Sequence, residues 1–314
     1  MSQDTQYPWN GDIAIKVDAY KAGQVGMKIR IPGWVKGQPV PTDLYYYSDG
    51  KRLGYTITVN GKKVEAQVTE DGYYTINRKW KTGDVGRVHF DLEARTVRAN
   101  NKVEADRGCI SIERGPIVYC AEWPDNKGFD IMSILENREP QIAEGKLSYD
   151  GFIDPKYKNV LTLYKGQNME TLTENVQTLA YDKSGKLSTK DQTLTLIPYF
   201  AWAHRGNGNM KVWLPQDGKA AKPSAPATLA AQAKVEFSSP APAKSSITDG
   251  LVPADENDRS IPYIHWWPKK NTTEWITYTF PESKEIKTST VYWYDDQPWG
   301  GCKVPDSWKL YYQD

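Results

Sequence analysis

Apolar and polar residues alternate with a period of two in successive short segments between residues 12 and 99. The strongest example is YTITVNGKKVEAQV at residues 55–68, where Asn60-Gly61 separates two alternating runs. Such alternation is typical of half-buried β-strands, and Asn-Gly is the preferred pair for a type I′ hairpin turn. Helical periodicity of 3.6 residues is almost absent between these segments, which favours sandwiches over alternating strands and helices. The sequence therefore predicts an all-β fold built from tandem β-sandwich domains.

Other segments extend this pattern along the chain. Residues 107–122 predict two strands about Gly115-Pro116, and residues 131–139 predict one short helical turn or an ordered loop. Further strands are predicted at 12–17, 26–34, 70–99, 159–166, 176–182, 192–206, 209–215, 274–280, 289–296 and 306–313.

Length and composition suggest the domain organisation. A chain of 314 residues is long enough for two or three domains of about 100–150 residues. Residues 216–232, QDGKAAKPSAPATLAAQ, are rich in Ala, Pro, Lys and Ser without an apolar stripe, as expected for a linker. We therefore predict sandwich domains at 1–105 and 106–215, a linker at 216–232, and a third domain at 233–314.

The charge balance argues against two classes of partner. Lys and Arg number 40 against 39 Asp and Glu, a net charge of +1, which gives no field for attracting nucleic acid or anionic lipid. No segment approaches the roughly 20 apolar residues that span a bilayer. The first residues, MSQDTQYPWNGD, have neither the basic nor the apolar region of a signal peptide, so they do not reveal the localisation.

No sequence pattern identifies catalytic residues. Three cysteines leave one unpaired, no CxxC occurs, and the three histidines lie far apart, which disfavours a disulfide framework or a structural zinc site. Asp295 and Asp296 are adjacent on a predicted strand and point to opposite faces, so they make a poor acid–base pair. His204, in AWAHRGNGN, is better explained by a turn between two strands than by a phosphate loop. We assign no catalytic residue.

An acidic loop is a candidate calcium site. The segment TDGLVPADENDRS, residues 248–260, crowds oxygen donors as a hard cation requires. The candidate ligands are Asp249, Asp255, Asn257 and Asp258. The alternative is a solvated acidic turn.

Aromatic residues provide a candidate sugar site. The chain has 12 Trp and 20 Tyr but only 6 Phe, and Trp and Tyr combine an apolar face with a polar tip. A sugar can stack on such rings while nearby polar groups bind its hydroxyls. The candidate platform is Tyr263, His265, Trp266, Trp267 and Trp299. Core packing is the alternative, because adjacent residues of an extended segment face opposite ways.

Several longer phrases resemble one enzyme family. The phrases MKIRIPGW, TVNGK, GYYTINRKWKTGD and RGPIVYCAE resemble the non-catalytic β-sandwich that follows the helical barrel in glycoside hydrolase family 127, the β-L-arabinofuranosidase family. TLIPYFAWAHRGNGNMKVWLP resembles the end of that sandwich region, and YPWNGDI resembles its start. The resemblance covers roughly residues 5–215.

The remaining residues resemble a different module. SSITDG, TTEWITYTF, TVYWYDD and VPDSWKLYYQD are similar to a discoidin or coagulation-factor-type C domain, a jelly-roll scaffold of many carbohydrate-binding modules. The 82 residues from 233 to 314 are fewer than a complete jelly roll of eight strands uses. We therefore expect an incomplete third sandwich cut at Asp314, with Trp308, Leu310 and Tyr312 left exposed.

The resemblance implies an accessory function. In the family, catalysis belongs to an upstream (α/α)-barrel with a cysteine nucleophile near zinc, and this chain has neither long amphipathic helices nor a Cys-Cys pair. We therefore transfer no catalytic role to Cys109 or Cys120, and we expect no cofactor beyond a structural calcium. The expected function is to support a missing N-terminal barrel and to bind arabinose-containing polysaccharide. The resemblance also implies a secreted or periplasmic bacterial protein. The alternative is a self-contained carbohydrate-binding or adhesion module.

Overall fold

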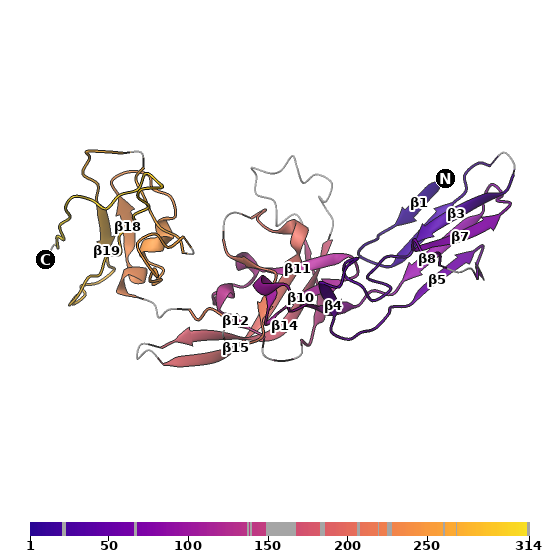
Figure 1. Cartoon of the computed structure of the whole chain (residues 1–314), viewed down its shortest axis with the longest axis horizontal. Helices are drawn as coiled ribbons and strands as arrows, with labels where there is room; N and C mark the ends of the chain where they lie inside the picture. The colour runs from indigo at the N-terminus through magenta and orange to yellow at the C-terminus, as the bar shows by residue number, and fades with distance from the viewer. Residues whose placement is uncertain are drawn as a thin grey trace. The chain divides into compact units, whose positions relative to one another are not determined.

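The computed structural model describes residues 1–20, 23–65, 68–136, 138, 140–148, 168–182, 186–205, 208–218, 220–224, 228–259, 261–267 and 269–312. Strands form nearly all the regular structure, and every helix within these ranges is a short 3-10 turn (Figure 1). None of these helices is long and apolar enough to cross a membrane. The prediction of an all-β fold is confirmed. The chain divides into two compact units, the first comprising residues 1–179 and 188–224 and the second comprising 180–187 and 225–314.

The first unit begins with a small β-sandwich. A five-stranded sheet in the order β1-β2-β8-β5-β6 packs against the two-stranded ribbon β3-β7. The strands are β1 Ser2–Thr5, β2 Asp12–Lys16, β3 Val25–Arg30, β5 Tyr55–Val59, β6 Lys62–Lys63, β7 Tyr73–Arg78 and β8 Val85–Phe90. Alternate residues of the ribbon and of the larger sheet form one core, for example Ile29, Ile76, Ile57 and Val88. The period-two pattern therefore marks the buried faces correctly.

The predicted hairpin turns have the expected backbone. Asn60 and Gly61 have φ values of 49° and 76°, and Thr58 pairs with Lys63 across the turn. Gly115 also has a positive φ, 57°, where Arg114 pairs with Ile117. Both turns therefore require conformations that glycine or asparagine adopts readily.

A larger sheet forms the rest of the first unit. Its main path runs β12-β14-β15-β11-β10-β9-β4, with β13 pairing β14, β16 pairing β11 and β17 pairing β10. The strands are β4 Tyr45–Tyr47, β9 Ala94–Ala99, β10 Cys109–Arg114, β11 Ile117–Glu122, β12 Ile134–Leu135, β13 Ala143–Ser148, β14 Asn168–Tyr181, β15 Leu187–Pro198, β16 Met210–Lys211 and β17 Leu214–Pro215. Apolar residues from six of these strands form a second core, which includes Ile110, Tyr119, Leu172 and Leu196.

Short 3-10 turns, and one strand that crosses from the small sandwich to the larger sheet, complete this unit. The turns are η1 Glu104–Asp106, η2 Trp123–Asp125, η3 Ile131–Ser133 and η7 Tyr199–Ala201. Strand β4 lies between β3 and β5 in the sequence, but it pairs with β9 of the larger sheet, with Tyr47 opposite Val97. The domain boundary at residue 105 stays a prediction, and β9, which precedes it, belongs to the larger sheet by its hydrogen bonds.

The predicted strand at 192–206 is longer than the observed one. Strand β15 ends at Pro198 and the chain turns into η7, because proline cannot donate a hydrogen bond to continue the ladder. The short turn predicted within 131–139 is present as η3. The predicted strand at 159–166 lies outside the described residues.

The predicted linker is partly packed. Ala221 is buried with Leu135 and Leu179, and the Ser224 N–H donates to the Leu179 carbonyl at 2.9 Å. The first part of the segment 216–232 therefore contacts the larger sheet rather than running free over the surface.

The second unit has little regular structure. Its ribbon pairs β18 Lys234–Phe237 with β19 Ile276–Thr279, and its 3-10 turns are η8 Leu229–Gln232 and η9 Lys244–Ile247. No residue described between 228 and 312 is fully buried. As expected, Trp308, Leu310 and Tyr312 are exposed.

Two predicted strands of this unit are not formed. Residues 289–296 and 306–312 have no ladder partner among the described residues. Alternation favours an extended chain, but a strand also requires backbone hydrogen bonds to a neighbouring segment. The two segments instead meet through the rings of Trp293 and Trp308, whose centroids lie 6.2 Å apart.

Candidate functional site

Three partly exposed aromatic side chains follow β15. Tyr199, Phe200 and Trp202, here called the aromatic edge, are 43%, 40% and 38% exposed. The rings of Tyr199 and Trp202 are stacked, with centroids 6.2 Å apart and planes 19° apart. With Ala203 and His204 these residues line an open hollow of about 400 Å³. Large aromatic side chains held at a surface are typical of binding sites for apolar surfaces or sugar rings.

A buried charged network holds the turn that carries the aromatic edge. Arg205 Nη1 donates to Asp125 Oδ1 at 2.7 Å, and Nη2 donates to Asp125 Oδ2 and Glu122 Oε2. Glu122 is only 1% exposed, and its Oε1 accepts the Ala203 N–H at 2.8 Å. That hydrogen bond fixes Ala203 in the left-handed region, at φ 63°. The network therefore makes the aromatic edge a rigid surface.

Neighbouring contacts attach the edge to the sandwich. The Asn126 side chain donates to the Glu122 and Thr195 carbonyls, and it accepts the Thr195 N–H. The Phe200 ring lies 6.1 Å from the Trp9 ring, and Arg114 donates to the Trp9 carbonyl at 3.1 Å. Residues far apart in the sequence thus meet beneath one surface.

The ionisable groups near the edge do not form a catalytic pair. Glu122 and Asp125 both bind the same guanidinium, and burial lowers the pKa of His204, so its imidazole is neutral at pH 7. A glycosidase needs one carboxylic acid and one free carboxylate across a cleft. The arrangement suits binding rather than acid–base chemistry.

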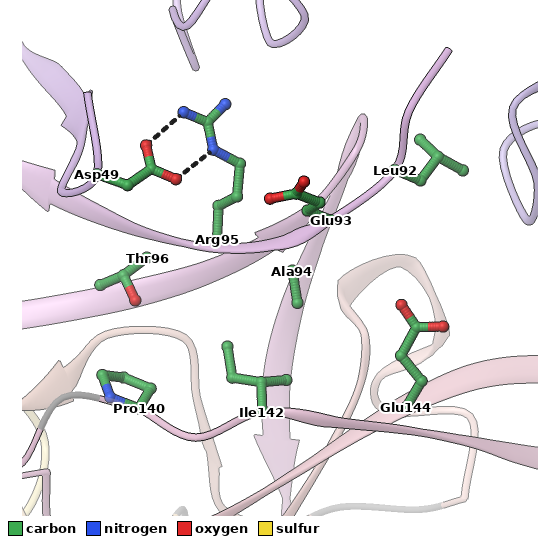
Figure 2. A pocket seen from close by; sticks show the side chains of 9 residues that line it. All are labelled: Asp49, Leu92, Glu93, Ala94, Arg95, Thr96, Pro140, Ile142 and Glu144. Carbon is green, nitrogen blue, oxygen red and sulfur yellow. Dashed lines mark hydrogen bonds and ion pairs between the residues drawn. The ribbon is translucent and has the colours of Figure 1, made fainter. Parts of the chain in front are cut away.

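A second hollow, of about 420 Å³, opens beside β9 (Figure 2). Figure 2 shows Arg95 facing Asp49 across two parallel contacts, Nη2 to Oδ1 at 2.6 Å and Nε to Oδ2 at 3.0 Å. The guanidinium of Arg95 also lies 3.5 Å from the ring centre of Tyr47. The hydrogen bond from the Arg95 side chain lowers the pKa of Asp49. On the opposite side of the hollow, Glu144 pairs with Arg114 at 2.7 Å. These ion pairs join Arg95 of β9 to the turn after β4, and Arg114 of β10 to Glu144 of β13.

The predicted sugar-binding residues lie in the second unit and are only partly assembled. The Tyr263 ring stacks on Tyr294 with centroids 3.6 Å apart, and it lies 6.0 Å from the His265 ring. Trp266 is half-buried, whereas Trp267 and Trp299 are 59% and 89% exposed. A Cβ at Gly301 would lie 2.3 Å from Trp267 Nε1, so this indole covers a backbone position that requires glycine. Among the described residues, no ring contact joins Trp299 to the other four.

The predicted calcium ligands act as turn acceptors. Asp249 accepts the Leu251 N–H at 2.9 Å, Asp255 accepts the Asn257 N–H at 3.0 Å, and Asp258 accepts the Ala254 N–H at 2.9 Å. Within the described ranges, no three acidic, histidine or cysteine side chains come close enough together to hold a metal ion. Calcium binding by Asp249, Asp255, Asn257 and Asp258 stays a prediction.

The cysteines do not have the environment of nucleophiles. Cys109, Cys120 and Cys302 are free thiols, and burial raises the pKa of each, that of Cys120 to about 12. A thiolate is the reactive form and the metal ligand, so burial disfavours both reactivity and metal binding at these thiols. The described residues therefore do not fit the cysteine–zinc site that the resemblance implies for the family's catalytic barrel.

Two family models match the chain in sequence. The model described as beta-L-arabinofuranosidase, GH127 middle domain, matches residues 1–93. The model described as glycoside hydrolase family 127 C-terminal domain matches residues 94–215. The two matches adjoin and together contain both sandwiches of the first unit.

Similar proteins extend well beyond the matched region. A non-reducing end beta-L-arabinofuranosidase of Bifidobacterium longum is 30% identical over 220 residues, 68% of this chain and 30% of that protein. A solved GH127 beta-arabinofuranosidase is 51% identical with a TM-score of 0.61, over 71% of this chain and 32% of that one. A GH127 beta-L-arabinofuranosidase from Geobacillus stearothermophilus T6 is 26% identical with a TM-score of 0.51, over 68% of this chain and 30% of that one. The chain thus spans about a third of the length of these relatives. Residues 1–215 belong to glycoside hydrolase family 127, as its middle and C-terminal domains.

Proposed function

We propose that residues 1–215 are non-catalytic accessory domains of a β-L-arabinofuranosidase-like glycosidase. Their task is to support the catalytic domain of the longer protein. The observation that carries this proposal is the aromatic edge, a rigid aromatic surface without a free acid–base pair. The buried carboxylates beneath it are bound to Arg205, and the thiols of the chain are protonated near neutral pH.

The occupant that we propose for the aromatic edge is that catalytic domain. About two thirds of each similar protein lies outside the region matched by this chain, so a large partner segment is available in those proteins. Stable contacts between domains bury aromatic side chains that are already held in place, because little conformational entropy is then lost. Tyr199, Phe200 and Trp202 meet this condition through the Glu122–Arg205–Asp125 network.

The solved 51% identical relative allows a direct check of this surface. Residues of that protein aligned with Tyr199, Phe200 and Trp202 should lose most of their accessible area when its whole chain is considered instead of its matched third. Exposed aromatic residues at these positions in the whole relative would contradict the proposal.

An activity assay on the 314-residue chain alone tests whether these domains are non-catalytic. We expect no release of arabinose from a p-nitrophenyl β-L-arabinofuranoside, whereas the full-length relative should release it under the same conditions. Hydrolysis by the 314 residues would refute an accessory function.

For the second unit we propose carbohydrate binding by a discoidin-like module. The observations that support it are the exposed indoles of Trp267 and Trp299 and the stacked rings of Tyr263 and Tyr294 in the same unit. The ligand class is an arabinose-containing polysaccharide, because the first unit belongs to an arabinofuranosidase family.

Affinity electrophoresis in soluble arabinan tests this second proposal. The wild-type chain should be retarded, and Trp267→Ala should weaken the affinity at least about fivefold, since one stacked ring contributes about 1–3 kcal/mol in comparable π-stacking. Trp123→Ala, which removes an exposed indole of the first unit, is the matched control. If Trp267→Ala is retarded as strongly as Trp123→Ala, then Trp267 does not contribute to sugar binding and the proposal is contradicted.

A further inference from the structure

The loop at residues 295–302 of the second unit, here called the indole loop, is closed by its own hydrogen bonds. The Gln297 side chain donates to the Gly300 carbonyl at 2.8 Å. The Gly300 N–H donates to the Asp296 carbonyl at 2.7 Å, and the Cys302 N–H donates to Asp296 Oδ1 at 2.8 Å. These bonds join the two ends of the loop and brace its turn, so the loop keeps its shape without support from a sheet.

The indole loop carries one exposed tryptophan and contacts another. Trp299, within the loop, is 89% exposed. The indole of Trp267, which is 59% exposed, lies over Gly301, where a Cβ would come 2.3 Å from Nε1. Gly301 is close to Trp299 in the chain, since the two residues between their Cα atoms span at most about 7 Å. The loop therefore brings together two exposed indoles that are far apart in the sequence.

A guanidinium lies at the base of the same loop. Arg259 Nε donates to the Tyr294 hydroxyl at 3.1 Å, and Nη2 lies 3.8 Å from Asp296 Oδ2. The Arg259 side chain is 66% exposed, so N–H groups remain available to donate to hydroxyl groups of a ligand. Aromatic faces beside a hydrogen-bond donor are the combination that a sugar ring requires.

The exposure of the indoles indicates which part of a polysaccharide they suit. A pocket that encloses the end of a chain needs walls, whereas an indole that is 89% exposed has none around it. Within the described part of the chain, the rings of Trp267 and Trp299 do not contact each other, so they offer two separate stacking surfaces. Successive bases of a single-stranded nucleic acid stack on separate aromatic side chains in the same way. The arrangement suits successive sugars of one chain.

We propose that the indole loop binds a segment within an arabinose-containing chain, with one sugar on Trp267, another on Trp299 and Arg259 as the hydrogen-bond donor. This inference rests on the carbohydrate binding proposed for the second unit. It adds that the ligand is an oligosaccharide segment rather than a single sugar or a chain end. Asp296 and Gly301 are positioning residues, because one closes the loop and the other leaves room for the indole of Trp267.

Isothermal titration calorimetry of the 314-residue chain with methyl L-arabinofuranoside and with arabinotetraose tests the proposal. Arabinotetraose should bind the wild type at least about fivefold more tightly, because it reaches both indoles. Trp299→Ala and Trp267→Ala should each remove this advantage, since one indole then remains. Tyr312→Ala, which removes a ring that is 88% exposed in the same unit, should keep it.

A conservative variant separates stacking from a change in the loop. Trp299→Tyr keeps an aromatic face and should retain most of the advantage of arabinotetraose. Equal affinity of the wild type for the two ligands, or an undiminished advantage in Trp299→Ala, would overturn the inference and leave sugar binding by the second unit intact. Binding of neither ligand would overturn both proposals.

Discussion

Replacing Arg205 with methionine should lower the free energy of unfolding by about 3–5 kcal/mol. The methionine keeps the apolar stem but removes every hydrogen bond to Glu122 and Asp125. Among the described residues, the Glu122 side chain, at 1% exposure, then keeps one hydrogen bond, from the Ala203 N–H. Removing one partner of a buried pair costs more than the pair contributes, because the remaining charge stays desolvated. Urea denaturation followed by circular dichroism measures the change.

An exposed arginine provides the control for this substitution. Arg138 contacts Asp191 at 3.4 Å, with side chains 58% and 70% exposed, so Arg138→Met should change stability by less than about 0.5 kcal/mol. Arg205→Lys should fall between the two, because an ammonium cannot bind both carboxylates in the forked geometry. A loss below 1 kcal/mol in Arg205→Met would show that the network does not hold the aromatic edge.

Gly11→Ala should destabilise the small sandwich by about 2–3 kcal/mol. A Cβ at residue 11 would lie 1.8 Å from the Phe90 carbonyl oxygen and 2.8 Å from its carbonyl carbon. Strand β8 cannot move away, because it is paired with β2 on one side and β5 on the other. The Phe90 N–H to Gly11 carbonyl bond, 3.1 Å long, would also be strained. Thermal unfolding monitored by circular dichroism provides the comparison with wild type.

Gly218→Ala is the matched control for the glycine substitution. A Cβ at residue 218 meets nothing within 4 Å, and its φ is not in the left-handed region. The stability of this variant should equal that of wild type or exceed it slightly, since alanine reduces the entropy of the unfolded chain. If Gly11→Ala is as stable as Gly218→Ala, then the close contact between Gly11 and β8 does not limit the residue at position 11.

The parts of the fold that were predicted from the sequence depend on local preferences. Asn60-Gly61 determines a hairpin because both residues tolerate positive φ, and alternation identifies the faces of β3, β5, β7 and β8. Pairing between distant segments is not encoded locally in this way. Nothing in YYY at residues 45–47 indicates β9 as its partner, and alternation at 289–296 does not provide a neighbouring strand.

The candidate site could not be predicted from the sequence, because it too depends on contacts between distant segments. Tyr199, Phe200 and Trp202 occur in a phrase interpreted as one long strand, although Pro198 is a local signal that the strand ends there. Glu122 and Arg205 are 83 residues apart, so only the fold reveals their ion pair. The acidic loop at 248–260 has many oxygen donors in its sequence, but the described residues do not bring three of these side chains together.

Strand β4 has a consequence for how genes of this kind recombine. The two family models meet between residues 93 and 94, yet β4 on one side of that point covers the edge of β9 on the other. A crossover at the boundary would give one product an uncovered β9, and exposed strand edges promote aggregation. Selection against such products would keep both sandwiches together, so we expect them to be inherited as a single cassette.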